Sequence, residues 1–331
     1  MRALILAAGF GTRLGSLGSE RPKPMFPVCD VPLIRYGVAL LRGFGITEIA
    51  VNLHHHGELI EAELGDGGAF GVRITYSREE IILGTGGGIV KLADFLTDGG
   101  RESFLVVNGK LVIDADLNQL IARHRERDAV GTMLLRETPD AQKWGAIELG
   151  EDEAVTRILE QGRAVENARL CMFTGVHILS PRLIARLPNS GESDSVRQAY
   201  IPALLDGERI EGVLHRGYFH EHSTPARYLQ GNWNVLGGKA ALRHPPEVLV
   251  GISEAAQVSP EARIIQPVKI SAGAAIAAGA QIGPNVVVGK NAVVGSRAQL
   301  SRVVLWPGSR IDSALTDAIV TPRTVYQVEG E

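Results

Sequence analysis

Short apolar runs alternate with stretches of helical spacing through the first part of the chain. The apolar runs predict buried strands at 3–8, 48–52, 73–76 and 103–108. The intervening three- and four-residue spacing of apolar side chains predicts helices at 32–44, 58–64, 87–96 and 117–127, the last capped by Asp116. Strands and helices in this order are typical of a mostly parallel sheet covered on both faces. Such sheets bind ligands at the carboxyl ends of their strands, where a glycine-rich loop and Asn108 both fall.

The pattern becomes strand-rich after residue 128. Strands are predicted at 129–135, 145–149, 154–159, 172–178 and 212–215, with helices at 181–187 and 195–205. Two glycines and two prolines in 237–250 predict a linker. We therefore expect a first domain at 1–236, a linker at 237–250 and a second domain at 251–331.

Aliphatic residues recur at a strict interval of six in this second domain. They are Val258, Ile264, Ile270, Ile276, Ile282, Val288, Val294 and Leu300, and Ala or Val stands two positions before each. A period of six fits neither a helix nor a simple strand. It fits a triangular solenoid in which each hexad forms one flat side, and it resembles the hexapeptide-repeat left-handed β-helix. The repeated apolar faces favour a homo-oligomer.

Composition narrows the class of protein. A chain of 331 residues with 45% hydrophobic residues can bury two cores. The net charge of −3 gives no basic field, so nucleic acid is not an expected partner. Two cysteines suit a reducing compartment, and we expect a cytoplasmic protein. No apolar run approaches the length of a membrane span, so no membrane association is expected.

A glycine-rich loop follows the first predicted strand and predicts a phosphate site. It holds Gly9, Gly11 and Gly15, with Arg13 inside it and Lys23 further on between two prolines. Glycines allow backbone N–H groups to approach a phosphate, and the two cations supply charge. The spacing differs from G-x-G-x-x-G, and the second strand ends without a carboxylate for a ribose. The loop therefore predicts a polyphosphate cradle rather than a dinucleotide site.

The string G-x-G-T-R-L, followed in register by P-K-P, resembles the signature of the sugar-1-phosphate nucleotidyltransferases (NDP-sugar pyrophosphorylases) over about residues 1–236. The resemblance implies an α/β fold with a Rossmann-like mixed, mostly parallel sheet. It implies nucleotidyl transfer from an NTP to a sugar 1-phosphate, with release of pyrophosphate. The chain is most similar to the mannose-1-phosphate guanylyltransferase branch, which favours GTP and mannose 1-phosphate. The motifs alone do not identify the base or the sugar, because uridylyl- and thymidylyltransferases share them.

The resemblance also implies which residues form the site. The implied nucleotide-binding residues are Leu6, Ala7, Ala8, Gly9, Gly11, Thr12, Arg13, Lys23, Glu79, Gly84, Thr85 and Asn108. The implied sugar-binding residues are Gly109, Gly145, Glu160 and Thr174. Arg13, Lys23 and Lys110 are the candidate catalytic residues. A purely structural alternative for the second glycine-rich stretch, 84–88, is the start of a helix capped by Thr85.

The two positions that would hold Mg²⁺ depart from the family's pattern of two aspartates. Lys110 stands at the first position and Glu221 at the second, so Glu221 is the expected metal ligand. An ammonium group cannot coordinate Mg²⁺ and would repel it. Three interpretations of Lys110 stay open: it abolishes turnover, it replaces part of the metal's charge, or it is an engineered substitution that traps a substrate complex. The first leaves a nucleotide- or sugar-binding or regulatory homologue as the alternative function. An acyltransferase is discounted, because residues 251–331 contain no histidine.

Overall fold

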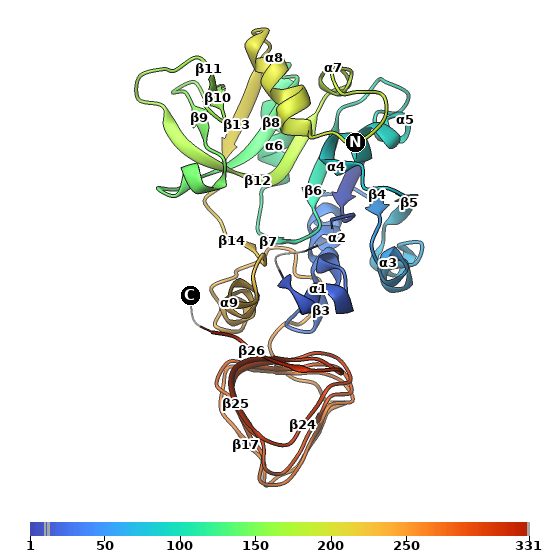
Figure 1. The fold of residues 1–331 in the computed structure, drawn as a ribbon, viewed down its shortest axis with the longest axis vertical. Coiled ribbons are helices and arrows are strands. Elements are labelled where there is room, and N and C mark those ends of the chain that lie inside the picture. Colours follow the sequence, from blue (N-terminus) through green and yellow to red (C-terminus); the bar gives the residue numbers. More distant parts are fainter. Residues whose placement is uncertain (10, 12–13, 330–331) are drawn as a thin grey trace.

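The computed structural model describes residues 1–9, 11 and 14–329, and its centre is a ten-stranded mixed sheet (Figure 1). Strand β1 (Ala3–Leu6) lies between β4 (Glu48–Leu53) and β6 (Phe104–Asn108), and both neighbours run parallel to it. β5 (Arg73–Arg78) continues the parallel part beyond β4. β12 (Arg169–Leu179) pairs antiparallel with β6 and begins the second half of the sheet. The α/β fold with a mostly parallel arrangement around β1 is confirmed.

Helices cover both faces of this sheet, so apolar residues on both faces of the central strand β1 are buried. Successive residues of a strand point to opposite faces. Ile5 of β1 packs with apolar residues of α2 (Leu33–Gly43). Its neighbour Leu4 packs instead with residues of α4 (Gly84–Lys91) and α5 (Ala93–Leu96). The predicted helix 87–96 is therefore two helices, and it begins three residues earlier than expected.

The remaining elements extend the sheet and its cover. The strands are β8 (Gly131–Glu137), β9 (Ile147–Leu149), β10 (Val155–Ile158), β11 (Gln161–Gly162) and β13 (Ile210–Leu214). The helices are α1 (Ser16–Glu20), α3 (Gly57–Leu64), α6 (Leu117–Glu126), α7 (Pro181–Ile184), a π-helix (Val196–Tyr200) and α8 (Ile201–Leu205). Asp116 caps α6 as predicted, since its Oδ1 accepts from the backbone N–H groups of Asn118 and Gln119.

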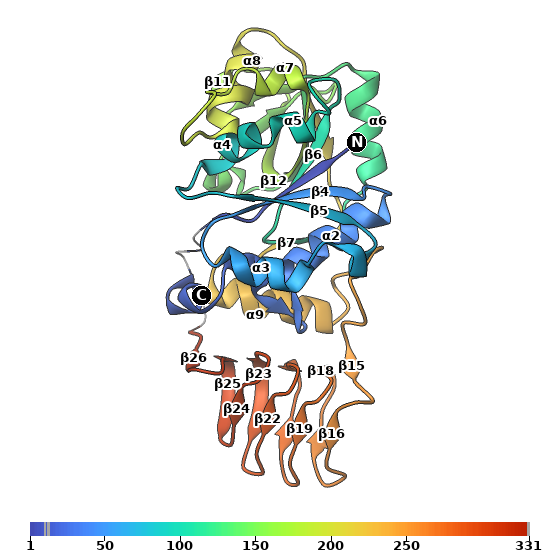
Figure 2. The ribbon, with the colours of Figure 1, turned by 90° about the vertical axis from the view of Figure 1, so that its right-hand side faces the viewer.

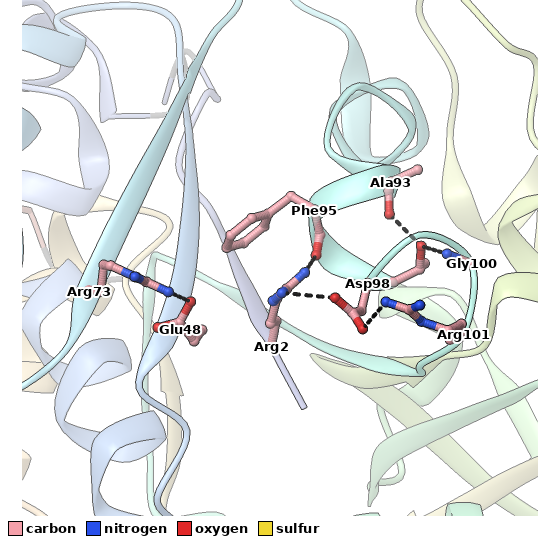
Figure 3. A network of polar contacts seen from close by, with 9 residues as sticks. Arg2, Glu48, Arg73, Ala93, Phe95, Asp98, Gly100 and Arg101 are labelled. Atoms are coloured by element: carbon pink, nitrogen blue, oxygen red, sulfur yellow. Dashed lines mark hydrogen bonds and ion pairs between the residues drawn. The ribbon is translucent and has the colours of Figure 1, made fainter.

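A network of polar contacts fastens the amino ends of the strands (Figure 3). Arg2 precedes β1, donates to the carbonyl of Phe95 and pairs with Asp98 at 3.1 Å. Arg73 pairs with Glu48, and these are the first residues of β5 and β4. These ion pairs lie at the amino ends of β1, β4 and β5.

A small second sheet was not predicted from the sequence. β7 (Leu111–Ile113) pairs antiparallel with β14 (Phe219–Glu221), with Leu111 opposite Glu221. Helix α9 (Pro225–Leu236) follows, and the hydroxyl of Thr224 caps it by accepting from the N–H of Arg227. The pairing brings position 110, immediately before β7, beside position 221.

The C-terminal strands form a parallel β-helix with a triangular outline, whose coils lie side by side (Figures 1 and 2). One side is β15 (Gly251–Ile252), β18 (Val268–Ile270) and β21 (Val286–Val288), joined by β23 (Gln299–Leu305). The second is β16 (Gln257–Val258), β19 (Ala275–Ile276), β22 (Val293–Val294) and β24 (Arg310–Ile311), and the third contains β17 (Arg263–Ile264) and β20 (Gln281–Ile282). Gln257 pairs with Ala275 and Ala275 with Val293, so three hexads complete each coil. The last strands are β25 (Ala314–Val320) and β26 (Val325–Gln327).

The β-helix packs against α9 through a buried aromatic cluster, with α9 lying above the coils in Figure 2. Trp306 follows β23 and is fully buried, and its Nε1 donates to the hydroxyl of Tyr228 in α9 at 3.0 Å. Phe26 meets the ring of Trp306 edge-on, with the centroids 5.1 Å apart. The Tyr228 hydroxyl in turn donates to the carbonyl of Pro27. The two parts of the chain are therefore joined by a shared core. No helix in the described part of the chain is long and apolar enough to cross a membrane.

The free energy of unfolding is expected to decrease as the pH is lowered, because His177 is buried and its burial disfavours the charged form. Its Nδ1 lies 2.9 Å from the Tyr200 hydroxyl, and burial lowers the pKa of His177 to about 3. An unfolded chain binds this proton near pH 6.5, so stability is fully present above that pH and is lost as pH falls toward 3. His177→Gln should remove about 1.4 kcal/mol per pH unit from the slope of unfolding free energy between about pH 6 and pH 4. Urea unfolding at several pH values measures this slope, and equal slopes in the two proteins would refute the assignment.

Candidate active site

A cleft of about 320 Å³ opens at the carboxyl ends of β1, β4 and β6. Its lining is Leu6, Ala7, Ala8, Gly9, Gly11, Lys23, Pro24, Asn52, Ile82, Gly84, Thr85, Asn108, Lys110 and Ser223. Most of the predicted nucleotide-binding residues that the structure describes are therefore brought together. Thr12 and Arg13 lie outside the described residues. The lining residues Pro24, Asn52, Ile82 and Ser223 were not among the predicted site residues.

The glycine-rich loop presents its backbone to the cleft. The N–H of Ala7 donates to Oδ1 of Asn52 at 2.7 Å, which ties the start of the loop to the end of β4. A Cβ built on Gly9 would meet nothing within 4 Å, so this backbone faces open space. Gly11 has φ +67°, a conformation that glycine adopts without strain. These features suit the close approach of a large anionic group.

Glu79 is buried and supports the residues around the cleft through hydrogen bonds. Its Oε1 accepts from Nδ2 of Asn52 at 2.8 Å, and its Oε2 accepts from the backbone N–H of Leu83 at 2.9 Å. Both carboxylate oxygens are engaged within the protein, and over the described residues the cleft lining does not include Glu79. Glu79 therefore holds Asn52 and the start of α4 in place.

The second glycine-rich stretch packs closely under the loop 191–195. A Cβ on Gly84 would lie 2.5 Å from the carbonyl oxygen of Ser193, and one on Gly87 would lie 2.4 Å from that of Gly191. Thr85 is not a helix cap, because α4 begins at Gly84 with Leu83 as its N-cap. Instead, the Thr85 hydroxyl accepts from the N–H of Ser195 at 3.0 Å. Gly84 and Thr85 line the cleft while the glycines beside them allow the close packing.

Two lysines converge on one carboxylate at the floor of the cleft. Lys23 comes from the 3₁₀ turn η2 (Lys23–Met25), and its Nζ lies 3.6 Å from Oε1 of Glu221. The Nζ of Lys110 lies 2.8 Å from the same oxygen. The Lys23 side chain is 8% exposed and that of Lys110 is 34% exposed, so the Lys110 ammonium is the more accessible of the two.

Burial disfavours the charged form of the two histidines beside this cluster. His222 is fully buried, and burial lowers its pKa well below 6.5. Burial also lowers the pKa of His220, whose Nε2 lies 2.7 Å from the carbonyl of Arg227. Gly231 of α9 makes room for His222, because a Cβ there would lie 2.1 Å from Nε2. The side chains of Lys23, Lys110 and Glu221 together carry a formal charge of +1.

The predicted sugar-binding residues are not among the lining residues of this cleft in the described part of the chain. The Thr174 hydroxyl donates to the carbonyl of Leu134 at 2.7 Å inside the sheet, and Glu160 is exposed in the turn between β10 and β11. Gly145 has φ +84° and lies against Leu159, while the N–H of Gly109 donates to the carbonyl of Leu6 at 2.9 Å. Within the described part of the chain, the lining includes none of these four. Their role in sugar binding stays a prediction.

The residues at the predicted metal position do not fit Mg²⁺. Across residues 1–9, 11 and 14–329 there is no group of three or more His, Cys, Asp or Glu that could hold a metal ion. Glu221 contacts two ammonium groups. Asp114 accepts from the backbone N–H of Arg243 at 2.7 Å and pairs with its guanidinium, and Asp116 caps α6. Mg²⁺ prefers oxygen ligands, and this cluster offers it one carboxylate and two positive charges.

Comparison with known proteins identifies the family to which the chain is similar. Residues 2–238 match the family described as nucleotidyl transferase. The chain is 34% identical over 269 residues to a mannose-1-phosphate guanylyltransferase of Mycobacterium tuberculosis, covering 80% of this chain and 73% of that protein. It is 32% identical to a UTP–glucose-1-phosphate uridylyltransferase of Synechocystis, covering 62% of this chain and 55% of that protein. A probable mannose-1-phosphate guanylyltransferase 2 of Arabidopsis thaliana is 27% identical, with 70% and 64% covered.

Solved structures share the fold. The crystal structure of HddC from Yersinia pseudotuberculosis complexed with GMP-PN superposes with a TM-score of 0.59 at 23% identity, covering 71% of this chain and 99% of that one. A putative glucose-1-phosphate thymidylyltransferase from Bacillus anthracis gives 0.59 at 20% identity, covering 70% of this chain and 94% of that one. The chain therefore belongs to the nucleotidyl transferase family, as an enzyme of the sugar-1-phosphate nucleotidyltransferase type with a β-helix at its C-terminal end.

Proposed function

We propose that this chain transfers a guanylyl group from GTP to mannose 1-phosphate, giving GDP-mannose and pyrophosphate. The observation that carries the proposal is the convergence of Lys23 and Lys110 on the cleft that the glycine-rich loop borders. The similarity to the guanylyltransferase of Mycobacterium tuberculosis supports this choice of base and sugar.

The reaction needs positioning and charge more than a covalent intermediate. An oxygen of the sugar 1-phosphate attacks the α-phosphorus of the NTP, and the bond breaks between that phosphorus and the oxygen that joins it to the β-phosphorus. The electron pair leaves with pyrophosphate, and the attacking oxygen already carries negative charge, so no protein base is required. The backbone of residues 6–9 and 84–85 would hold the nucleoside. Lys23 and Lys110 would offset the charge of the phosphates.

Magnesium is left out of this mechanism. The donor set around Glu221 does not fit it, so no step is routed through a metal. Arg13, Thr12 and Glu79 keep their proposed parts in nucleotide binding, with Glu79 acting through Asn52 and Leu83. Gly109, Gly145, Glu160 and Thr174 keep theirs on the sugar side.

We also propose the domain boundaries, the self-assembly and the cellular location of this protein. The transferase domain spans 1–236, the linker 237–250 and the β-helix 251–331, with the β-helix used for self-assembly into a homo-oligomer. α9 ends at Leu236 and β15 begins at Gly251, which supports this division. We place the protein in the cytoplasm, where its substrates would be, and the free thiols of Cys29 and Cys171 support that location.

A catalytically inactive nucleotide- or sugar-binding homologue is the second candidate. The observation that favours it is the engagement of Glu221 by two ammonium groups in place of a metal. Pyrophosphate release separates the two, measured with GTP, ATP, UTP and dTTP, each against mannose, glucose and galactose 1-phosphates. We expect release that is fastest with GTP and mannose 1-phosphate. Silence from every pair, with nucleotide binding intact, would contradict the proposal and leave the binding protein.

A further inference from the structure

The position of Lys110 is set by the small sheet and not by a flexible loop. Glu221 is the last residue of β14 and lies opposite Leu111, the first residue of β7. The backbone at position 110 is therefore fixed next to Glu221, and the 2.8 Å contact between Lys110 Nζ and Glu221 Oε1 follows from this register. The same lysine lines the cleft.

We infer that the Lys110 ammonium group stands in for a divalent cation, so that the cleft takes a nucleoside triphosphate whose phosphates carry no metal. This rests on the proposed function and deepens it, because it names the form of the nucleotide that binds. The juxtaposition of Lys23, Glu221 and Lys110 beside the glycine-rich loop is the site in question.

Charge supports the inference. The side chains of Lys23, Lys110 and Glu221 together carry a formal charge of +1 without any metal. Lys110→Asp would lower that charge by two, to −1. One divalent ion restores the difference, and the new carboxylate beside Glu221 would supply a second ligand for it. The present chain therefore needs no divalent ion where the variant does.

The hydrogen-bonding capacity of the ammonium group is also sufficient. An ammonium group has three donors, and the Nζ of Lys110 forms an ion pair with Oε1 of Glu221 at 2.8 Å. With its side chain 34% exposed, Lys110 has donors left for phosphate oxygens while Glu221 keeps it in place. Lys23, at 8% exposure, is the more deeply set partner in the same cluster.

Nucleotide binding by titration calorimetry tests the inference without depending on turnover. The full chain, Lys110→Asp and Lys110→Gln are titrated with GTP, ATP, UTP and dTTP in EDTA and in Mg²⁺. The unmodified chain should bind its nucleotide in EDTA, and Mg²⁺ should not tighten that binding. Lys110→Asp should lose at least about tenfold in affinity in EDTA and regain it in Mg²⁺. Lys110→Gln, which removes the charge without adding a ligand, should lose affinity in both.

Two controls make the result specific. Lys239→Asp makes the same charge change at an exposed position in 237–250, and it should bind like the unmodified chain. Mn²⁺ alone, followed by electron paramagnetic resonance, should be bound by Lys110→Asp and not by the unmodified chain.

The outcomes distinguish metal-free nucleotide binding from nucleotidyl transfer itself. Nucleotide binding by the unmodified chain only in Mg²⁺, or Mn²⁺ binding by it, overturns the inference and leaves the proposed function standing. Equal affinities of the unmodified chain and Lys110→Gln in EDTA also overturn it. Binding of no nucleotide under either condition overturns both.

Discussion

Lys23→Gln is expected to slow pyrophosphate release by about 10²–10³-fold, the loss typical of removing one preorganised charge from a transition state. Lys23 is buried at the floor of the cleft, where the surrounding apolar groups strengthen its field. Glutamine keeps a similar length and a donor but loses the charge. The effect should appear mainly in kcat, because Lys110 still supplies charge for ground-state binding.

Steady-state pyrophosphate release checks this prediction, with Lys239→Gln as the matched control. Lys239 lies exposed in 237–250, so the control should turn over normally. Thermal unfolding of both variants shows whether either has lost its fold. An unchanged kcat in a folded Lys23→Gln variant would remove Lys23 from the catalytic machinery.

Trp306→Ala is expected to lower the free energy of unfolding by about 3–5 kcal/mol, the cost of deleting a large aromatic side chain from a core. The indole is fully buried where the β-helix meets α9. Its loss also leaves the Tyr228 hydroxyl without the donor at 3.0 Å. Since the ring joins the two parts of the chain, the variant should separate the unfolding of the β-helix from that of the transferase domain.

Urea unfolding followed by circular dichroism measures both effects. Trp144→Ala is the control, because Trp144 is 38% exposed and should cost far less. A Trp306→Ala variant as stable as the control would show that the two parts do not depend on this junction.

The sequence predicted the elements whose pattern is local. The six-residue period predicted the β-helix because every coil repeats the same inward positions, which are buried in the structure from Val268 to Leu300. The apolar run of β1 and its glycine-rich loop predicted the cleft, because carboxyl ends of parallel strands gather there. Asn52 ends β4 and lines the cleft, so the same rule could have identified it.

The pairing of strands that are far apart in the chain could not be predicted from the sequence. β7 and β14 are three residues each and more than a hundred residues apart, so neither has a pattern of its own. Their pairing is what sets Lys110 against Glu221. The hydrogen bonds from Asn52 and Leu83 to Glu79 could not be predicted either, because the sequence alone does not show whether a carboxylate is buried or which groups it contacts. Helix α9 did carry a signal, since Thr224 followed by proline is a common helix start.

We propose that this chain transfers a nucleotidyl group with lysine charge in place of a metal. The most direct measurement is pyrophosphate release by the unmodified chain from GTP and mannose 1-phosphate, compared between EDTA and Mg²⁺. Release in EDTA that Mg²⁺ does not accelerate is the predicted result. Release that appears only when Mg²⁺ is added would contradict the account and return Glu221 to the role of metal ligand.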